Sequence, residues 1–232
     1  MNFNASVILS EAWEYAKKHF LMMGLFMLVI YVITSFIQGI LSVGSQAELN
    51  EIVKSEDINK MLDYYAAQGP ALTISSLIAS IASIGVLATA LNIVLGKKDK
   101  VDFSGFQMPF EQWVKLICAE ILSDVIIYIG IFCCIIPGLI FSARLLLVKP
   151  IIMANPNIPF FDAFKQSWAM TKGQTMSLLW LGFLIVVINF IGLCCCCVGL
   201  LFTAPLTYFA QSVVFVALNE KMNVQYNTQN EN

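Results

Sequence analysis

The chain has 232 residues, of which 59% are hydrophobic and only 12% charged, and its net charge is −2. An ordinary soluble domain carries about 25% charged residues. A soluble protein of this size could not bury so much apolar surface, so the composition predicts that lipid is the solvent. The slight negative charge argues against a nucleic-acid partner. A single histidine leaves little from which to build a polar active site, and we expect no catalysis, no cofactor and no metal.

The N-terminal segment differs from a secretory signal. Glu11 and Glu14 stand where a positive region should be. The apolar run that follows, residues 20–43, is longer than the roughly 7–15 residues of a signal's apolar core. We interpret this run as a retained first transmembrane helix.

Six apolar runs reach or approach the length of a membrane span. A helix needs about 20 apolar residues to cross a hydrocarbon core of roughly 30 Å. The runs are residues 20–43, 71–96, 113–136, 138–153, 175–198 and 199–218. The fourth is the shortest and contains Arg144 and Lys149. Asn92, Asn189 and Gln211 interrupt other runs and predict faces that contact other helices. The predicted fold is an all-α polytopic transmembrane bundle of about six spans.

Two segments repeat nearly the same sequence. Residues 128–145 read YIGIFCCIIPGLIFSARL, and residues 190–206 read FIGLCCCCVGLLFTAPL. With Pro137 left out, the glycines, the paired cysteines and several further positions coincide. Repetition of this kind predicts a repeated structural unit, here a helical hairpin with a tight turn.

The lysines predict the orientation of the six spans. With the N-terminus in the cytoplasm, one side receives ten lysines, namely Lys17, Lys18, Lys97, Lys98, Lys100, Lys115, Lys149, Lys165, Lys172 and Lys221. The other side receives Lys54 and Lys60 among several acidic residues. Basic residues concentrate in cytoplasmic loops. Both termini are therefore expected in the cytoplasm, and the protein in a cell inner membrane.

Three segments that precede spans one, three and five are predicted to be interfacial helices. They are residues 4–19, the short segment around Phe106, Phe110 and Trp113, and residues 160–172. Apolar faces are predicted at Ile8, Ala12, Tyr15 and Ala16 in the first segment, and at Phe161, Phe164 and Trp168 in the third. Each segment has a Trp and a nearby Lys, which is typical of a helix at headgroup depth. The alternative is that these segments are the water-exposed ends of longer helices.

The predicted organisation is a single integral membrane domain, residues 1–232, built from interfacial-helix and hairpin units. The units are residues 4–96, 106–154 and 158–218, followed by a disordered cytoplasmic tail at 219–232. In the first unit a small extracytoplasmic insert, residues 45–69, replaces the tight turn. It is expected to form two short helices, the second capped by Ser55, because serine is a favourable N-cap residue.

Four ionisable residues at membrane depth are the strongest candidates for a binding site. Glu120 and Asp124 lie one turn apart on one helix face, and Arg144 and Lys149 lie at similar depth in the next span. A lone charge at the bilayer centre costs at least about 2.5–3.5 kcal/mol, so these groups should pair or reach water. One interpretation is a polar seam that binds a small anion, a lipid headgroup or a partner. The other is a structural lock, with Lys149 reaching toward the cytoplasm.

The cysteines gather at the two predicted turns. They are Cys133, Cys134, Cys194, Cys195, Cys196 and Cys197. A disulfide between the turns would suit an oxidising compartment. Alternatively, cysteine serves as a small apolar residue that lets helices pack closely. No second cysteine pair or nearby histidine completes zinc-ligand spacing.

From residue 137 onward the chain resembles a known family. The segments PGLIFSARLLLVKP (137–150) and FFDAFKQSWAMTKGQ (160–174) resemble the membrane domain attached to some bacterial glycerophosphoryl diester phosphodiesterases. The matching residues are Pro137, Gly138, Arg144, Pro150, Ala163, Ser167, Lys172 and Gly173. The resemblance implies a multi-pass helical protein of a bacterial membrane. The soluble catalytic domain is absent from this sequence, so the resemblance implies no reaction. An acidic residue often found after the second proline is also missing, since Met153, Ala154 and Asn155 stand there.

The expected function is that of a non-enzymatic scaffold or interaction protein in the bacterial inner membrane. Its expected partners are membrane lipids and either a membrane protein or a second copy of itself. One alternative is a small carrier or channel whose hydrated path is lined by Glu120, Asp124, Arg144, Asn92 and Asn189. Another is an immunity-type protein that blocks a membrane-active toxin through the acidic insert.

Overall fold

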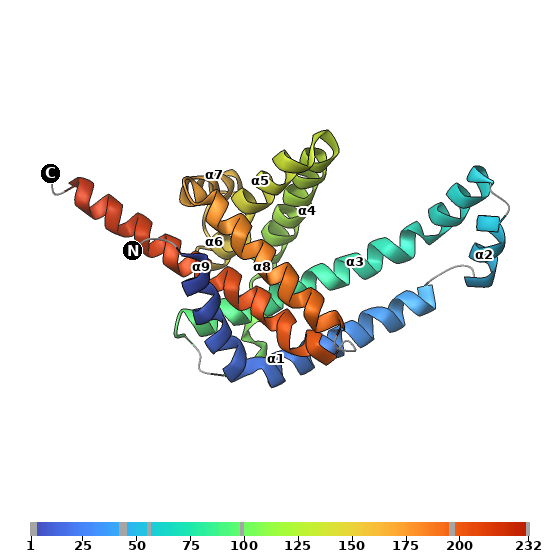
Figure 1. The fold of residues 1–232 in the computed structure, drawn as a ribbon, viewed down its shortest axis with the longest axis horizontal. Coiled ribbons are helices and arrows are strands. Elements are labelled where there is room, and N and C mark those ends of the chain that lie inside the picture. The colour runs from blue at the N-terminus through green and yellow to red at the C-terminus, as the bar shows by residue number, and fades with distance from the viewer. Residues whose placement is uncertain (1–3, 42–45, 55–56, 98–99, 195–197, 231–232) are drawn as a thin grey trace. The chain divides into compact units, whose positions relative to one another are not determined.

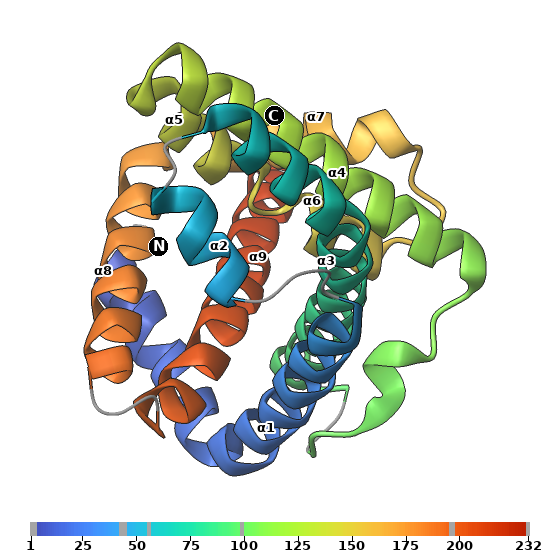
Figure 2. The same ribbon diagram turned by 90° about the vertical axis from the view of Figure 1, so that its right-hand side faces the viewer.

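The computed structural model describes residues 4–41, 46–54, 57–97, 100–194 and 198–230, and this part of the chain is helical without strands (Figures 1 and 2). The prediction of an all-α fold is confirmed. The helices are α1 (Ala5–Leu41), α2 (Gln46–Lys54), α3 (Ile58–Val94), α4 (Phe110–Cys133), α5 (Ile135–Leu145), α6 (Val148–Ala154), α7 (Phe160–Thr171), α8 (Thr175–Cys194) and α9 (Val198–Asn230), with a 3₁₀ turn, η1 (Phe103–Phe106), before α4.

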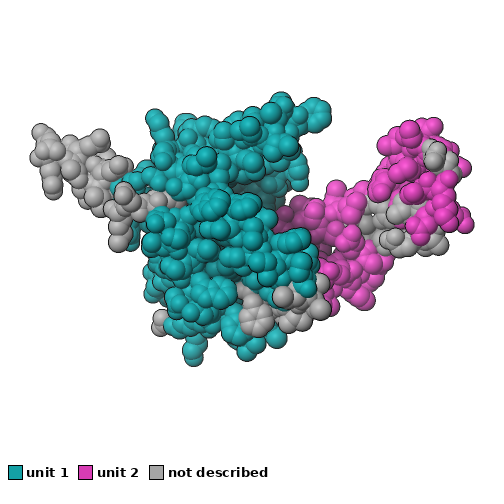
Figure 3. All heavy atoms as spheres, in the orientation of Figure 1, with its two compact units in different colours: residues 1–26, 84–232 teal, residues 27–83 magenta. Residues whose placement is uncertain are grey.

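The chain divides into two compact units (Figure 3). Unit 1 comprises residues 1–26 and 84–232, and unit 2 comprises residues 27–83. Unit 1 therefore holds α4 to α9 together with the beginning of α1 and the end of α3. Unit 2 holds the rest of α1, α2 and the beginning of α3.

Five helical segments in the described part of the chain are long and apolar enough to cross a membrane. They are Ala5–Ile40, Leu72–Val94, Phe110–Cys133, Ile135–Ala154 and Thr175–Cys194. The fourth consists of α5 and α6, which are separated by a short break at Leu146 and Leu147. These segments indicate a membrane protein that crosses the bilayer several times. The sixth predicted span falls in α9 and is not among the five, and side chains 200–202 lie outside the described residues.

Helix α9 forms much of the core of unit 1. Leu206, Phe209, Val214 and Leu218 are each no more than 1% exposed. The helix contacts α6, α7 and α8. The ring of Tyr15 in α1 stacks on Phe209 with centroids 6.0 Å apart. The buried part of α9 therefore lies between Leu206 and Leu218, whereas Thr207 and Glu220 are exposed.

Two helical hairpins bring pairs of glycines into contact. α4 packs against α5, and α8 packs against α9. Cys134, in an extended conformation, is the single residue between α4 and α5. A Cβ atom on Gly138 would lie 2.7 Å from the backbone nitrogen of Ile131, and one on Gly199 would lie 2.6 Å from Cα of Gly192. The glycines of the repeated segments therefore allow the two backbones of each hairpin to touch.

The helix boundaries follow ordinary local rules. α4 and α7 begin directly after Pro109 and Pro159, which have extended backbones, and both have an acidic residue in the first turn. Acidic side chains there interact favourably with the helix dipole. Gly96 and Gly173 have φ of +68° and +81° just after α3 and α7, a conformation that favours glycine.

The insert differs from its prediction. α2 matches the first short helix, but the second is continuous with span two in α3, because the helix runs on through Gly69 and Pro70. Proline inside a membrane helix is tolerated. The predicted cap Ser55 lies outside the described residues. Oδ1 of Asp57 accepts the backbone N–H groups of Asn59 and Lys60 at 3.0 and 3.4 Å, so Asp57 caps α3.

The predicted interfacial segments fare differently. Residues 4–19 are continuous with span one in α1, and their apolar face is buried in protein, since Ile8, Ala12 and Ala16 are at most 4% exposed. In the second segment Phe106 ends η1, whereas Phe110 and Trp113 lie in the first turn of α4. The first segment is therefore the end of a longer helix, as in the alternative, although its apolar face is buried. The third segment is a separate helix, α7, whose Phe161 and Trp168 face outward.

The predicted disordered tail is a further correction. Residues 219–230 continue α9 as a helix. Beyond Pro205 the sequence up to Asn230 contains no glycine or proline, and the helix therefore meets no stop signal.

Candidate functional site

The polar seam predicted between spans three and four is a contact between α4 and α6. Nζ of Lys149 lies 3.1 Å from Oε1 of Glu120, and the two side chains are 26% and 16% exposed. The second carboxylate oxygen of Glu120 is buried and accepts no hydrogen bond in the described part of the chain. The structure therefore brings two of the four candidate residues together as an ion pair that is largely withdrawn from solvent.

Two further polar side chains of α4 strengthen the same contact. Gln112, which is 5% exposed, donates from Nε2 to the carbonyl of Ile152 at 3.1 Å. Lys115 donates to the carbonyl of Pro156 at 3.2 Å and pairs with Glu111 at 3.0 Å. Each contact occupies a carbonyl at or beyond the end of α6, where the helix itself supplies no donor. The sequence analysis did not single out Gln112.

Arg144 points away from the seam and toward α7. Its guanidinium carbon lies 5.0 Å from the centroid of the Trp168 ring, and Nη1 donates to the Trp168 carbonyl at 3.2 Å. The hydroxyl of Ser167, which is fully buried, donates to the carbonyl of Arg144 at 2.7 Å. Nε of Arg144 is buried and has no hydrogen-bond partner in the described residues. Arg144 therefore attaches α7 to α5 through stacking and two hydrogen bonds.

Asp124 joins neither arrangement. Its side chain is exposed on α4, and no described cation lies within ion-pair distance of it. The predicted proximity of Asp124 to Arg144 and Lys149 does not occur, because Lys149 pairs with Glu120 and Arg144 turns to Trp168. The four candidate residues thus occupy three separate places.

Several residues that carry the family resemblance make contacts between helices. Arg144 and Ser167 are hydrogen-bonded to each other, and Ala163 is fully buried on the same face of α7 as Ser167. Gly138 makes the contact between α5 and α4, and Gly173 forms the left-handed turn after α7. These contacts have a structural role.

The polar side chains predicted to contact other helices do so in α8 and α9. Nδ2 of Asn189 donates to Oγ1 of Thr207 at 3.1 Å, across the α8–α9 hairpin. Nε2 of Gln211 donates to the carbonyl of Leu146 at 2.6 Å. That carbonyl lies at the break between α5 and α6. Hydrogen bonds of this kind link membrane helices. The prediction is confirmed for these two residues.

Asn92 lines a small polar cavity of about 160 Å³ at the end of α3. Lys97, Gln107 and Gln112 also line it, together with Ala154 at the end of α6. The end of α3, the beginning of α4 and the end of α6 therefore meet at one place in unit 1. None of the four seam residues lines this cavity.

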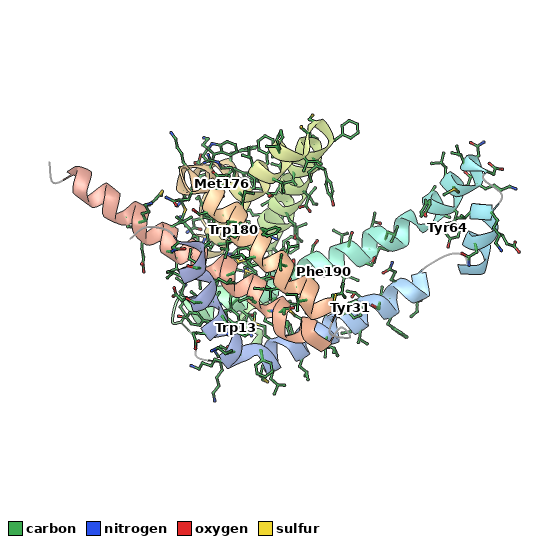
Figure 4. All side chains as sticks on the ribbon, viewed as in Figure 1. Trp13, Tyr31, Tyr64, Met176, Trp180 and Phe190 are labelled. Atoms are coloured by element: carbon green, nitrogen blue, oxygen red, sulfur yellow. The ribbon has the colours of Figure 1, made fainter. Side chains whose placement is uncertain are left out.

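A larger cleft of about 830 Å³ opens between α5, α8 and α9. Its lining is mainly apolar and includes Met176 and Trp180 of α8, which are 80% and 56% exposed (Figure 4). Three small residues, Ala143, Gly182 and Ala210, are among those that line it. The sequence analysis missed this cleft, since small residues in apolar helices are common and do not reveal which of them face each other.

Cys133, Cys134 and Cys194 are exposed and form no disulfide, and Cys195, Cys196 and Cys197 lie outside the described residues. Glycines make the close backbone contact in each hairpin. These three exposed cysteines are therefore not the small residues that let the helices pack closely. In the described part of the chain no three His, Cys, Asp or Glu side chains gather as metal ligands. Comparison of the chain with protein-family models, curated proteins and solved structures gives no match.

Proposed function

We propose that the chain is a six-span protein of a bacterial inner membrane, with both termini in the cytoplasm, that acts without catalysis as a scaffold in contact with lipid and a membrane partner. α9 supplies the sixth span. The hairpins α4–α5 and α8–α9 are copies of one repeated unit. The relationship to the membrane domain of glycerophosphoryl diester phosphodiesterases belongs to the same proposal.

The packing of unit 1 supports the proposed orientation. The small polar cavity joins the end of α3, the beginning of α4 and the end of α6, and Lys97 lines it. Lys115 reaches the carbonyl of Pro156 just beyond α6. Lysines that are scattered along the sequence therefore collect at one end of these helices, as expected for the cytoplasmic end.

The ion pair between Glu120 and Lys149 is the single observation that carries the assignment as a scaffold. Two charged groups at membrane depth, Glu120 and Lys149, are used in a contact between helices of the chain itself. Breaking such a pair during transport would leave a charge unpaired in a medium of low polarity, which is costly. A locked seam suits a protein that presents a fixed surface.

The residues required by the carrier alternative do not line one path. Arg144 faces α7, Asn189 bonds to Thr207, and Asn92 lines a separate cavity. Those positions favour the scaffold over the carrier. The immunity-type alternative rests on the acidic insert at residues 45–69 and stays a prediction.

The outward face of α7 is the part of unit 1 best suited to contact a partner. Phe161 and Trp168 are 68% and 43% exposed, while Ala163 and Ser167 on the opposite face are fully buried. Asp162 and Lys165 form an ion pair at 3.0 Å beside the aromatic side chains. Aromatic and charged groups side by side are typical of the membrane interface and of protein interfaces.

Purification from the native membrane combined with a flux assay tests the proposal. Affinity-tagged protein should retain a specific partner, identified by mass spectrometry, and replacement of Phe161 by serine should remove it at unchanged protein level. Glu111→Gln, an exposed change on α4 and so outside the α7 face, is the control. Vesicles containing the purified protein should be no more permeable to protons and small anions than protein-free vesicles. Flux that Glu120→Gln abolishes would overturn the proposal in favour of a carrier.

A further inference from the structure

The cleft between α5, α8 and α9 has the size and lining of a ligand site. Its volume of about 830 Å³ lies within the roughly 300–1,000 Å³ of small-molecule pockets. Hydrophobic side chains dominate the lining, and its polar side chains are those of Ser142, Thr207 and Gln211. Ser142 donates to the carbonyl of Leu139. Gln211 donates to Leu146, and Thr207 accepts from Asn189. These polar groups already have partners, so the cleft presents mainly hydrocarbon to its contents.

The length of the cleft matches one leaflet of a bilayer. Its lining on α8 extends from Met176 to Val186, a rise of about 15 Å at about 1.5 Å per residue. Half of a hydrocarbon core of roughly 30 Å is the same length. A partner's transmembrane helix would present twice that length. An acyl chain from a single leaflet therefore fits better.

A free cation precedes the cleft in the chain. Lys172 lies four residues before Met176, which is the first α8 residue of the lining. It is exposed, and no carboxylate in the described part of the chain pairs with it. Lys165 on α7, by contrast, pairs with Asp162. The first turn of α8 begins at Thr175, between Lys172 and the lining residue Met176 in the sequence. The N–H groups of a first helical turn favour anions.

We infer that this cleft binds an anionic phospholipid of the cytoplasmic leaflet, with an acyl chain between α5, α8 and α9 and the phosphate beside Lys172 and the beginning of α8. This inference rests on the proposed membrane location and names the lipid that the scaffold holds. The bound acyl chain would fill the space that the protein leaves open between these three helices.

Gly182 allows a direct test of the acyl-chain site. A Cβ atom built on Gly182 meets no atom within 4 Å, so Gly182→Leu should fill the cleft without disturbing the fold. Gly39 in α1 has the same open surroundings and does not line the cleft. Gly39→Leu is therefore the matched control, because both changes replace a helical glycine by a good helix former.

The measurement is native mass spectrometry of delipidated full-length protein titrated with phosphatidylglycerol or phosphatidylethanolamine of identical chains. The wild type should retain one phosphatidylglycerol more tightly than phosphatidylethanolamine. Gly182→Leu should weaken both at least tenfold, whereas Gly39→Leu should weaken neither. Lys172→Gln should reduce only the preference for phosphatidylglycerol, about fivefold, as expected for the loss of one basic residue at an anionic surface. Lys165→Gln should leave the preference unchanged.

Three results would overturn the inference. One is a folded Gly182→Leu protein that binds lipid as the wild type does. Another is wild-type protein that retains no lipid. The third is a dimer that Gly182→Leu dissociates, since a second copy would then occupy the cleft. Alkaline extraction of the membrane fraction distinguishes failure of this inference from failure of the proposed function. If the treatment releases the protein, the proposed membrane location is wrong. If the protein stays in the membrane but Gly182→Leu does not change lipid binding, only the proposed lipid site is wrong.

Discussion

Nζ of Lys149 on α6 lies 3.1 Å from Oε1 of Glu120 on α4, and both side chains are mostly withdrawn from solvent. α6 is only seven residues long, too short to be stable on its own. Its position depends on contacts with α4, α7 and α9, and this pair is the ion pair between α6 and α4. We interpret the pair as the lock that fixes the short helix against the longer one.

Removal of one partner of this pair should destabilise the protein. Glu120→Gln leaves Lys149 without its counter-charge, and we expect a loss toward the lower end of the roughly 3–5 kcal/mol found for buried pairs, because both groups keep some exposure. Replacing both, by Glu120→Leu with Lys149→Met, should restore most of the stability. The free energy of unfolding in detergent micelles, obtained by SDS titration, measures both effects.

The matched control for that experiment is Glu111→Gln. Glu111 pairs with Lys115 at 3.0 Å, but its side chain is 81% exposed. An exposed pair contributes at most about 1 kcal/mol. Equal losses for Glu111→Gln and Glu120→Gln would contradict the role given to the α4–α6 pair.

The glycine contacts predict a second contrast. Gly138→Ala places a Cβ atom 2.7 Å from the backbone nitrogen of Ile131. A backbone neighbour cannot rotate away, so we expect a loss of about 1–3 kcal/mol, the usual cost of overpacking. Gly182→Ala meets no neighbouring atom and should be neutral or stabilising by up to about 1 kcal/mol. The thermal unfolding midpoint should therefore fall for Gly138→Ala and stay unchanged or rise for Gly182→Ala. A stabilised Gly138→Ala protein is incompatible with the hairpin contact.

The contact of Arg144 with Trp168 predicts that lysine cannot replace arginine. Arg144→Lys removes the planar group that stacks on the indole, which contributes about 1 kcal/mol. Backbone amides of α7 should then exchange faster with deuterium in detergent micelles, while those of α8 should be unaffected. Lys165→Gln is the control on the same helix. Unchanged protection of α7 in the Arg144→Lys protein would mean that the stack does not hold this helix.

A charge reversal tests whether Asp124 and Arg144 form one unit. Asp124 is exposed on α4 and pairs with no described cation, while Arg144 turns to α7. Asp124→Arg combined with Arg144→Asp should consequently be no more stable than the sum of the two single changes allows. Asp124→Asn alone should stay within about 0.5 kcal/mol of the wild type. A double-mutant cycle of unfolding free energies gives the coupling between the two residues. If the double variant recovers the stability that the single changes lose, Asp124 and Arg144 do pair, as the sequence predicted.

The hydropathy of the sequence was sufficient to predict the helical class and the positions of most apolar helices. Runs of about 20 apolar residues allow few alternatives in lipid. The same reasoning wrongly divided α1 into an interfacial and a spanning part, because alanines at positions 12 and 16 suit a lipid surface and a protein core equally well. The structure buries both alanines. Similarly, Gly69 and Pro70 suggested a boundary that the helix α3 does not observe.

The sequence predicted which four ionisable residues lie at membrane depth, but it did not predict which of them pair. Helix periodicity places Glu120 and Asp124 on one face of α4, yet it does not give the rotation of the next helix. The break at Leu146 and Leu147 turns Lys149 toward α4, whereas Arg144 before the break faces α7. Pro150 is the local signal for this break, since proline has no N–H group to donate to the carbonyl of Leu146, four residues before it. Its position does not predict how far the helix turns at the break.

The most direct test of the account is a map of which loops face which side of the membrane. In a cysteine-free background, single cysteines at Glu51 in α2 and at Lys100 before α4 would be treated with a membrane-impermeant maleimide. Both side chains are exposed. In intact cells we expect labelling at position 51 alone, and labelling at position 100 only after the membrane is permeabilised. Labelling at position 100 in intact cells, or none at position 51, would contradict the proposed six-span topology.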